Sequence, residues 1–184
     1  MSNRPPRIAL FATRWLGAEV LTRLHARGHD LALVTTQAED RSAKAARARA
    51  IPVVAKPDQV PLIPADLPWR PDLILCAHAF RILPDWLLQW SRLGGIGYHP
   101  SLLPAYRGRH AVADAITAGQ RFTGGTVYWL TRSIDAGPTV ILHSNPLQTR
   151  VQILANETAP ELWRRALAPL GADLFLEAVD GILG

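Results

Sequence analysis

Short apolar runs alternate with segments of helical spacing along this chain. The runs that predict buried strands are Arg7–Thr13, Asp30–Thr36, Asp72–Ala77 and Gly95–Tyr98. The segments that predict helices between them are Leu16–Arg27, which is followed by Gly28, and Pro84–Trp90, which has proline at its first position. Because strands that alternate with helices form parallel sheets, we expect an α/β fold, with a single doubly wound, mainly parallel sheet and helices on both faces.

The C-terminal half continues with a different pattern. Ala111–Ala118 predicts a helix, and Gly125–Leu130 and Thr139–Ser144 predict a pair of strands. A closing helix is expected from about Thr158 to Leu183, with one apolar stripe of Leu162, Ala166, Leu170, Leu174 and Val179. The proline-rich stretch Pro57–Pro71 predicts a surface connection. We expect residues 1–184 to form a single domain.

Composition excludes several classes of protein. With 48% hydrophobic and 19% charged residues, the chain is neither a disordered segment nor a coiled coil. Cys76 is the only cysteine, which excludes an intramolecular disulfide and a cysteine-based zinc site and is typical of a reducing compartment. The apolar run Ile8–Ala12 is too short for a signal peptide or a membrane span. These features predict a cytoplasmic protein without membrane contact.

The net charge of +5 comes almost entirely from arginine, since Lys44 and Lys56 are the only lysines. An arginine bias is compatible with anion recognition and also with a GC-rich coding sequence. Charge alone therefore identifies no partner.

Several cofactor motifs are missing. The turn after the first strand, Ala12–Gly17, lacks the G-x-G-x-x-G pattern, so the predicted fold does not imply NAD. No Walker loop, H-E-x-x-H or G-x-S-x-G occurs, and we expect no metal site.

His99 and Asp135 carry the clearest chemical signal. His99 directly follows the fourth predicted strand, and parallel sheets bind ligands beyond the carboxyl ends of their strands. A histidine fixed there beside an aspartate can act as a general acid or base near neutral pH. The alternative from the residues alone is that His99 ends a strand and Asp135 makes a turn.

The motif His-Pro-Ser-Leu-Leu-Pro at residues 99–104, with a later Asp-x-Gly-Pro at 135–138, resembles the signature of the 10-formyltetrahydrofolate-dependent formyltransferase family. The resemblance extends from Arg7 to Leu183. Three stretches, 15–20, 98–100 and 124–129, are most similar to the hydrolase domain of 10-formyltetrahydrofolate dehydrogenase. The resemblance implies that His99 is the catalytic histidine, that Asp135 is its acidic partner, and that 10-formyltetrahydrofolate is the formyl donor.

One position departs from the family pattern. The transferases carry an asparagine two residues before the histidine, where this chain has Gly97. Losing such an oxyanion donor typically costs roughly 100- to 1000-fold in rate. The hydrolase domain lacks this asparagine too, so water remains open as the formyl acceptor. A folate-binding or regulatory protein with a degenerate site is the alternative.

The resemblance also implies ligand-binding residues. A pterin ring would be held by Phe80, Arg81, Ile82 and Leu83, and by Ile134 in the loop that closes over it. Ser101, Arg107 and Arg109 are candidates for binding the acceptor or the glutamate tail of the folate. The alternatives are ordinary core side chains and solvated loop arginines.

The sequence constrains the identity of the formyl acceptor least. The segment Arg41–Arg49 holds four cations in the region where the tRNA enzymes have a basic loop, but the cations also fit a solvated helix face. We expect no C-terminal β-domain of the kind those enzymes have, which argues against nucleic acid. The expected partners are therefore the folate and water or a small amine, with a nucleotide-sugar amine or methionyl-tRNA as alternatives. A homodimer is compatible with the sequence.

Overall fold

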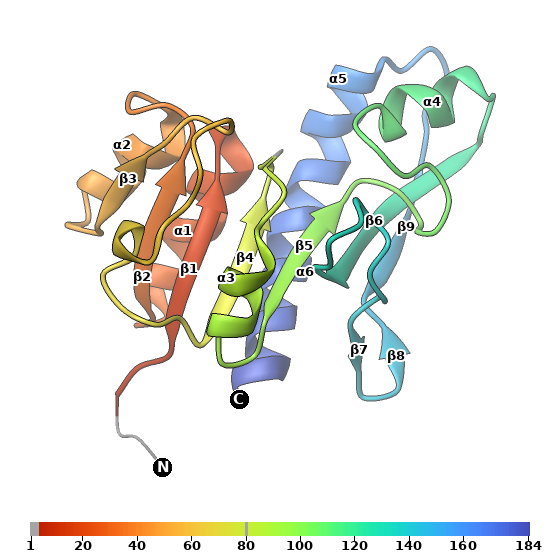
Figure 1. Cartoon of the computed structure of the whole chain (residues 1–184). Helices are drawn as coiled ribbons and strands as arrows, with labels where there is room; N and C mark the ends of the chain where they lie inside the picture. The colour runs from red at the N-terminus through yellow and green to blue at the C-terminus, as the bar shows by residue number, and fades with distance from the viewer. Residues whose placement is uncertain (1–3, 80) are drawn as a thin grey trace. The chain divides into compact units, whose positions relative to one another are not determined.

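The structure is a computed structural model that describes residues 4–79 and 81–184 (Figure 1). The chain divides into two compact units, Met1–Ile96 and Gly97–Gly184. Its main sheet has seven strands in the order β3-β2-β1-β4-β5-β6-β9, so the predicted α/β fold is confirmed. That residues 1–184 form a single domain stays a prediction.

The first unit holds four parallel strands. They are β1 (Arg7–Ala12), β2 (Asp30–Thr35), β3 (Val53–Ala55) and β4 (Leu73–Ala77). β1 pairs with β2 and with β4, and β2 pairs with β3. Nearly every residue of β1, β2 and β4 is buried, as expected for strands that are covered on both faces. The short strand β3 lies at the edge of the sheet and was not predicted.

The helices of the first unit are α1 (Arg14–Ala26), α2 (Arg41–Arg47), the single 3-10 turn η1 (Pro64–Asp66) and α3 (Asp85–Trp90). In Figure 1, α1 lies behind β1 and α3 lies in front of β4. α1 ends within one residue of the predicted end, because Gly28 has a φ of +80° that a helix cannot continue. α2 buries Ser42, Ala43 and Ala46 and exposes its cations, as a solvated basic face does.

The second unit starts within β5 (Gly95–His99) and continues with α4 (Ala111–Thr117) and the long strand β6 (Phe122–Trp129). The short strands β7 (Ile141–Leu142) and β8 (Asn145–Pro146) form a hairpin. β9 (Gln148–Gln152), α5 (Ala159–Leu162), the π-helical turn η2 (Trp163–Leu167) and α6 (Ala168–Leu183) follow.

The predicted pairing of Thr139–Ser144 with β6 is confirmed only at its start. Thr139 forms an antiparallel bridge with Tyr128, and the Val140 N–H donates to the Val127 carbonyl at 2.9 Å. The longer antiparallel partner of β6 is β9. β9 reads Gln-Thr-Arg-Val-Gln and is largely exposed. An edge strand needs no apolar run, so periodicity did not reveal it.

The closing helix is interrupted, and this changes its buried stripe. The π turn η2 inserts a residue into the helical spacing, so Leu167 is fully buried where the even spacing predicted Ala166. The Leu167 carbonyl accepts a 2.7 Å hydrogen bond from the buried hydroxyl of Tyr98. The Tyr98 ring also packs against Phe175, with 6.2 Å between the centroids. The π turn therefore ties the closing helix to β5.

Among the described residues, no helix combines the length and the apolar composition needed to cross a membrane.

Candidate active site

His99 is the last residue of β5, and the loop that follows it is fixed by hydroxyl groups. The Thr126 hydroxyl on β6 donates to the Ser101 carbonyl at 2.7 Å and accepts from the Leu103 N–H at 3.1 Å. The Ser101 hydroxyl donates to the Ala105 carbonyl at 2.6 Å. These bonds fix the start of the loop against β6, next to the histidine.

The His99 side chain is enclosed between two acceptors and is 5% exposed. Its Nδ1 lies 3.3 Å from Oδ2 of Asp135, and its Nε2 lies 2.7 Å from the Tyr106 carbonyl oxygen. A carbonyl oxygen only accepts, so Nε2 carries a hydrogen in this arrangement. The predicted pairing of His99 with Asp135 thus exists as a contact.

Three groups surround the Asp135 carboxylate. The Gly108 N–H donates to Oδ2 at 2.8 Å, and the Tyr128 hydroxyl donates to Oδ1 at 2.8 Å. His99 approaches the Oδ2 side. These donors fix the orientation of the Asp135 carboxyl group beside the imidazole ring.

This geometry is suited to acid–base chemistry. A carboxylate that orients a histidine leaves the other ring nitrogen to donate a hydrogen bond to an oxygen atom. In the structure that oxygen belongs to Tyr106. A substrate oxygen that exchanged with this carbonyl would receive the same hydrogen bond.

The predicted acceptor-binding residues differ in where they lie. Ser101 is fully buried, and its hydroxyl is bound within the loop. Arg107 and Arg109 are exposed on the same loop, close in sequence to Gly108. Ile134, next to Asp135, is 61% exposed, which is unusual for a large apolar side chain.

The residues of the first unit that were predicted to bind the pterin ring differ in their exposure and contacts. Phe80 lies outside the described residues. Leu83 is buried, whereas Ile82 is 58% exposed. Arg81 is held by its own chain: it donates to the carbonyls of Val60 at 2.8 Å and Lys56 at 3.0 Å.

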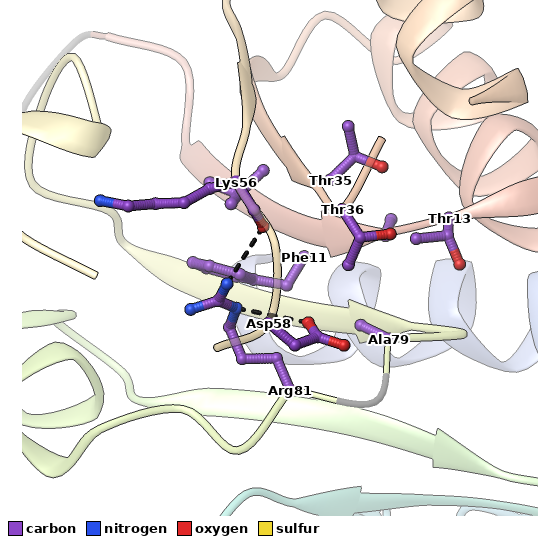
Figure 2. Close-up of a pocket in the computed structure, with 10 residues that line it drawn as sticks. Phe11, Thr13, Thr35, Thr36, Lys56, Asp58, Ala79 and Arg81 are labelled. Carbon is purple, nitrogen blue, oxygen red and sulfur yellow. Dashed lines mark hydrogen bonds and ion pairs between the residues drawn. The ribbon is translucent and has the colours of Figure 1, made fainter. Parts of the chain in front are cut away.

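Arg81 also faces Asp58 across 3.6 Å and donates to the Pro57 carbonyl. Figure 2 shows its guanidinium group directed toward Asp58 and the backbone of Lys56. The guanidinium of Arg81 therefore stabilises the segment 56–60, and a ligand would have to displace these contacts to use it.

Figure 2 shows the hollow beside Arg81, at the carboxyl ends of β1 and β2. It has an empty volume of about 220 Å³, part of it open to solvent, and its lining includes Phe11, Thr13, Thr35 and Thr36. The Thr35 hydroxyl is buried and, within the described part of the chain, makes no hydrogen bond. The remaining polar groups at the rim are largely engaged by the chain itself.

Three contacts at the site were not predicted from the sequence. They are the Tyr106 carbonyl, the Gly108 N–H and the Tyr128 hydroxyl. The two backbone groups leave no signal in a sequence. Tyr128 lies within the segment 124–129 that carried the family resemblance, and its alternation on β6 could have placed it facing the site.

A cysteine nucleophile or a metal ion would be an alternative to chemistry by His99 and Asp135. Burial raises the pKa of the Cys76 thiol to about 12, so it is not a nucleophile at neutral pH. In residues 4–79 and 81–184, no cluster of histidine, cysteine and carboxylate side chains could hold a metal ion.

Comparison with known proteins identifies the family. A family model described as "Formyl transferase" matches residues 7–179. The methionyl-tRNA formyltransferase of Acidobacterium capsulatum is 33% identical over 172 residues, which are 84% of this chain and 52% of that protein. The chain thus spans about half the length of the curated relatives it matches.

Solved structures agree with the fold. Phosphoribosylglycinamide formyltransferase from Bacillus halodurans has a TM-score of 0.79 at 24% identity, covering 97% of this chain and 95% of that one. A formyltetrahydrofolate deformylase from Pseudomonas syringae has a TM-score of 0.75 at 20% identity, covering 96% of this chain and 61% of that one. The match over residues 7–179 and the identity to the tRNA enzymes confirm the resemblance, and the chain belongs to the formyl transferase family.

Proposed function

We propose that this chain transfers the formyl group of 10-formyltetrahydrofolate to water or to a small amine, with His99 and Asp135 as its catalytic residues. The observation that carries the proposal is the buried contact of 3.3 Å between His99 Nδ1 and Asp135 Oδ2. It joins the two halves of the family motif, which lie 36 residues apart in the sequence. Membership of the formyl transferase family supports the reaction class.

His99 acts first on the formyl oxygen. Its Nε2–H, which donates to the Tyr106 carbonyl in this structure, would donate to the formyl oxygen instead. Negative charge develops on that oxygen as the acceptor adds to the formyl carbon, and a positioned donor stabilises it. Because the ring is buried, the loop that carries Tyr106 has to shift to admit the substrate.

Asp135 acts on the acceptor. With water as acceptor, its carboxylate orients the attacking molecule and takes up a proton from it. The folate supplies the formyl group and receives a proton on its nitrogen when the carbon–nitrogen bond breaks, and formate is released. The exposed apolar side chain of Ile134, beside Asp135, suits a flat aromatic ring.

Water is the first acceptor to test. Gly97 brings no side-chain donor to the site, and one of the fold neighbours is described as a formyltetrahydrofolate deformylase. Other relatives are described as methionyl-tRNA and phosphoribosylglycinamide formyltransferases, so an amine acceptor stays part of the proposal. We include a cytoplasmic location, which suits the single, free thiol of Cys76.

A specific observation favours a second candidate, a folate-binding protein without turnover. Both ring nitrogens of His99 already face acceptors within the chain, and Gly97 offers no donor. This candidate predicts saturable folate binding and no release of formate.

The experiment mixes the purified protein with 10-formyltetrahydrofolate and no amine, and follows tetrahydrofolate and formate release. His99→Ala should abolish release, and His25→Ala, at an exposed histidine of α1, should not change it. Release that depends on His99 supports the proposal. Binding without release, even after small amines are added, supports the second candidate. The absence of folate binding would overturn both.

A further inference from the structure

The Tyr128 ring and the Leu130 side chain pack closely against Gly97. Gly97 precedes His99 by two positions on β5, so the two residues face the same side of the strand. A Cβ atom at position 97 would come within 3.1 Å of the Tyr128 ring and 3.0 Å of the Leu130 side chain. Any side chain at this position would therefore have to displace the tyrosine ring.

From its position next to Gly97, the Tyr128 ring directs its hydroxyl toward Asp135. It donates a 2.8 Å hydrogen bond to Oδ1 of Asp135, while the Gly108 N–H and His99 take the Oδ2 side. Tyr128 is 8% exposed, so surrounding atoms hold its ring in place. With both oxygens engaged, the carboxylate cannot rotate away from the imidazole without breaking one of these contacts.

We propose that Tyr128 is a positioning residue, which holds the Asp135 carboxylate in the orientation that presents Oδ2 to His99. Gly97 is the residue that makes room for it. The glycine and the tyrosine therefore act as one unit: the missing side chain at position 97 admits a ring whose hydroxyl is part of the site.

The kinetic part of this inference rests on the proposed function. A misplaced carboxylate would leave ground-state binding of the folate largely intact and slow the chemical step. We expect Tyr128→Phe, which keeps the ring and removes the hydroxyl, to lower kcat by about 10- to 100-fold. The KM for the folate should change by no more than about twofold, because uniform binding is retained.

Tyr98→Phe is the matched control. It also removes a buried tyrosine hydroxyl, but that hydroxyl bonds to the Leu167 carbonyl, and neighbouring residues on a strand point to opposite faces. This variant should lower the thermal unfolding temperature and keep kcat. An equal fall of kcat in both variants would mean that general destabilisation is the cause, and the inference would be overturned.

A double-mutant cycle tests the role of Gly97. Gly97→Ala should displace the Tyr128 ring by a few tenths of an ångström and lower kcat. In the Tyr128→Phe background the hydroxyl is already gone, so adding Gly97→Ala should have little further effect on kcat. If the fold-changes in kcat of the two single variants multiply in full in the double variant, Gly97 and Tyr128 act independently, and their joint role is refuted.

A second readout does not depend on turnover. The ring 1H and 15N resonances of His99, assigned by comparison with His99→Ala, should move in Tyr128→Phe and stay in place in Tyr98→Phe. If the wild-type protein releases no formate but the resonances move in this way, the proposed function falls and the positioning role stands. If Tyr128→Phe leaves both the resonances and kcat unchanged, the positioning role is overturned.

Discussion

Tyr106 and Asp135 both have left-handed backbone conformations, with φ of +53° and +50°, and each presents an oxygen to one ring nitrogen of His99. Residues other than glycine seldom adopt such angles, which persist where the surrounding contacts over-determine them. At Asp135 those contacts come from Gly108 and Tyr128. The two oxygens are thus placed by strained backbone, as is common at functional sites.

Replacing Asp135 with asparagine should affect both rate and stability. A carboxamide has one acceptor oxygen, but the donors of Gly108 and Tyr128 bind different oxygens of the native carboxylate. One donor would therefore face an NH₂ group, at a cost of about 1–3 kcal/mol for an unsatisfied buried group. We expect formate release to fall by roughly 10²- to 10⁴-fold, together with a lower unfolding temperature. Release within tenfold of the wild-type rate would show that Asp135 is not a catalytic residue.

Gly97→Asn should lower the rate of formyl transfer. If the glycine were simply a lost donor, restoring asparagine would raise the rate. The Tyr128 ring and the Leu130 side chain occupy the space next to position 97, so the new side chain would displace them. We expect about a tenfold or greater loss of kcat, since small misplacements at a catalytic site are costly. A gain in rate, measured with water or with an amine as acceptor, would contradict this account.

The fold was largely predictable because its strands are buried on both faces. β1, β2 and β4 read as continuous apolar runs, and their positions agree with the prediction to within one residue at either end. The strands of the main sheet that were not predicted, β3 and β9, lie at its two edges. An edge strand needs no apolar pattern, and the apolar run after Thr139 pairs with β6 only at its first residues, before β9 continues the pairing.

The site was predictable only where a side chain carries the signal. The motif located His99 and Asp135, and the structure brings them together. It could not show that the Tyr106 carbonyl and the Gly108 N–H complete the site, since every residue has those groups. The role of Arg81 was equally hidden, because its partners are backbone carbonyls.

Two of the three arginines named from the sequence, Arg81 and Arg107, should respond differently to substitution. Arg81→Gln removes a guanidinium that binds the carbonyls of Val60 and Lys56, so we expect a loss of about 1–3 kcal/mol in the free energy of unfolding. Amide hydrogen exchange in the segment 56–60 should become faster. Unchanged exchange and stability would mean that these bonds do not hold the segment.

Arg107→Gln is the matched substitution at an exposed arginine. We expect its unfolding free energy to stay within about 0.5 kcal/mol of the wild type. If Arg107 binds an anionic part of the folate or of the acceptor, as the sequence predicts, the KM for that substrate should rise while kcat is kept. An unchanged KM for every substrate tested would leave Arg107 as a solvated residue.

Asp72, directly before β4, should make the stability of the protein depend on pH in the acid range. The side-chain hydrogen bond from Arg4, with contributions from the Arg7 N–H and Arg92, lowers the pKa of Asp72 to about 2, although burial opposes the shift. A pKa lowered from 3.8 to about 2 corresponds to about 2 kcal/mol of stability at neutral pH. Because the folded pKa lies below the unfolded one, this contribution is complete above about pH 4 and is lost as the pH falls through 2.

We therefore expect Asp72→Asn to lower the free energy of unfolding by about 2 kcal/mol at pH 7, and the difference from the wild type to shrink toward zero near pH 2. Asp30→Asn is the control, because the Asp30 side chain is 49% exposed and its contact with Arg7 is 3.7 Å. A surface pair of this kind contributes about 0–1 kcal/mol. Denaturant unfolding of the three proteins between pH 2 and 7 measures both effects. A loss in Asp72→Asn that stays constant over this range would show that the carboxylate charge is not what stabilises this end of the sheet.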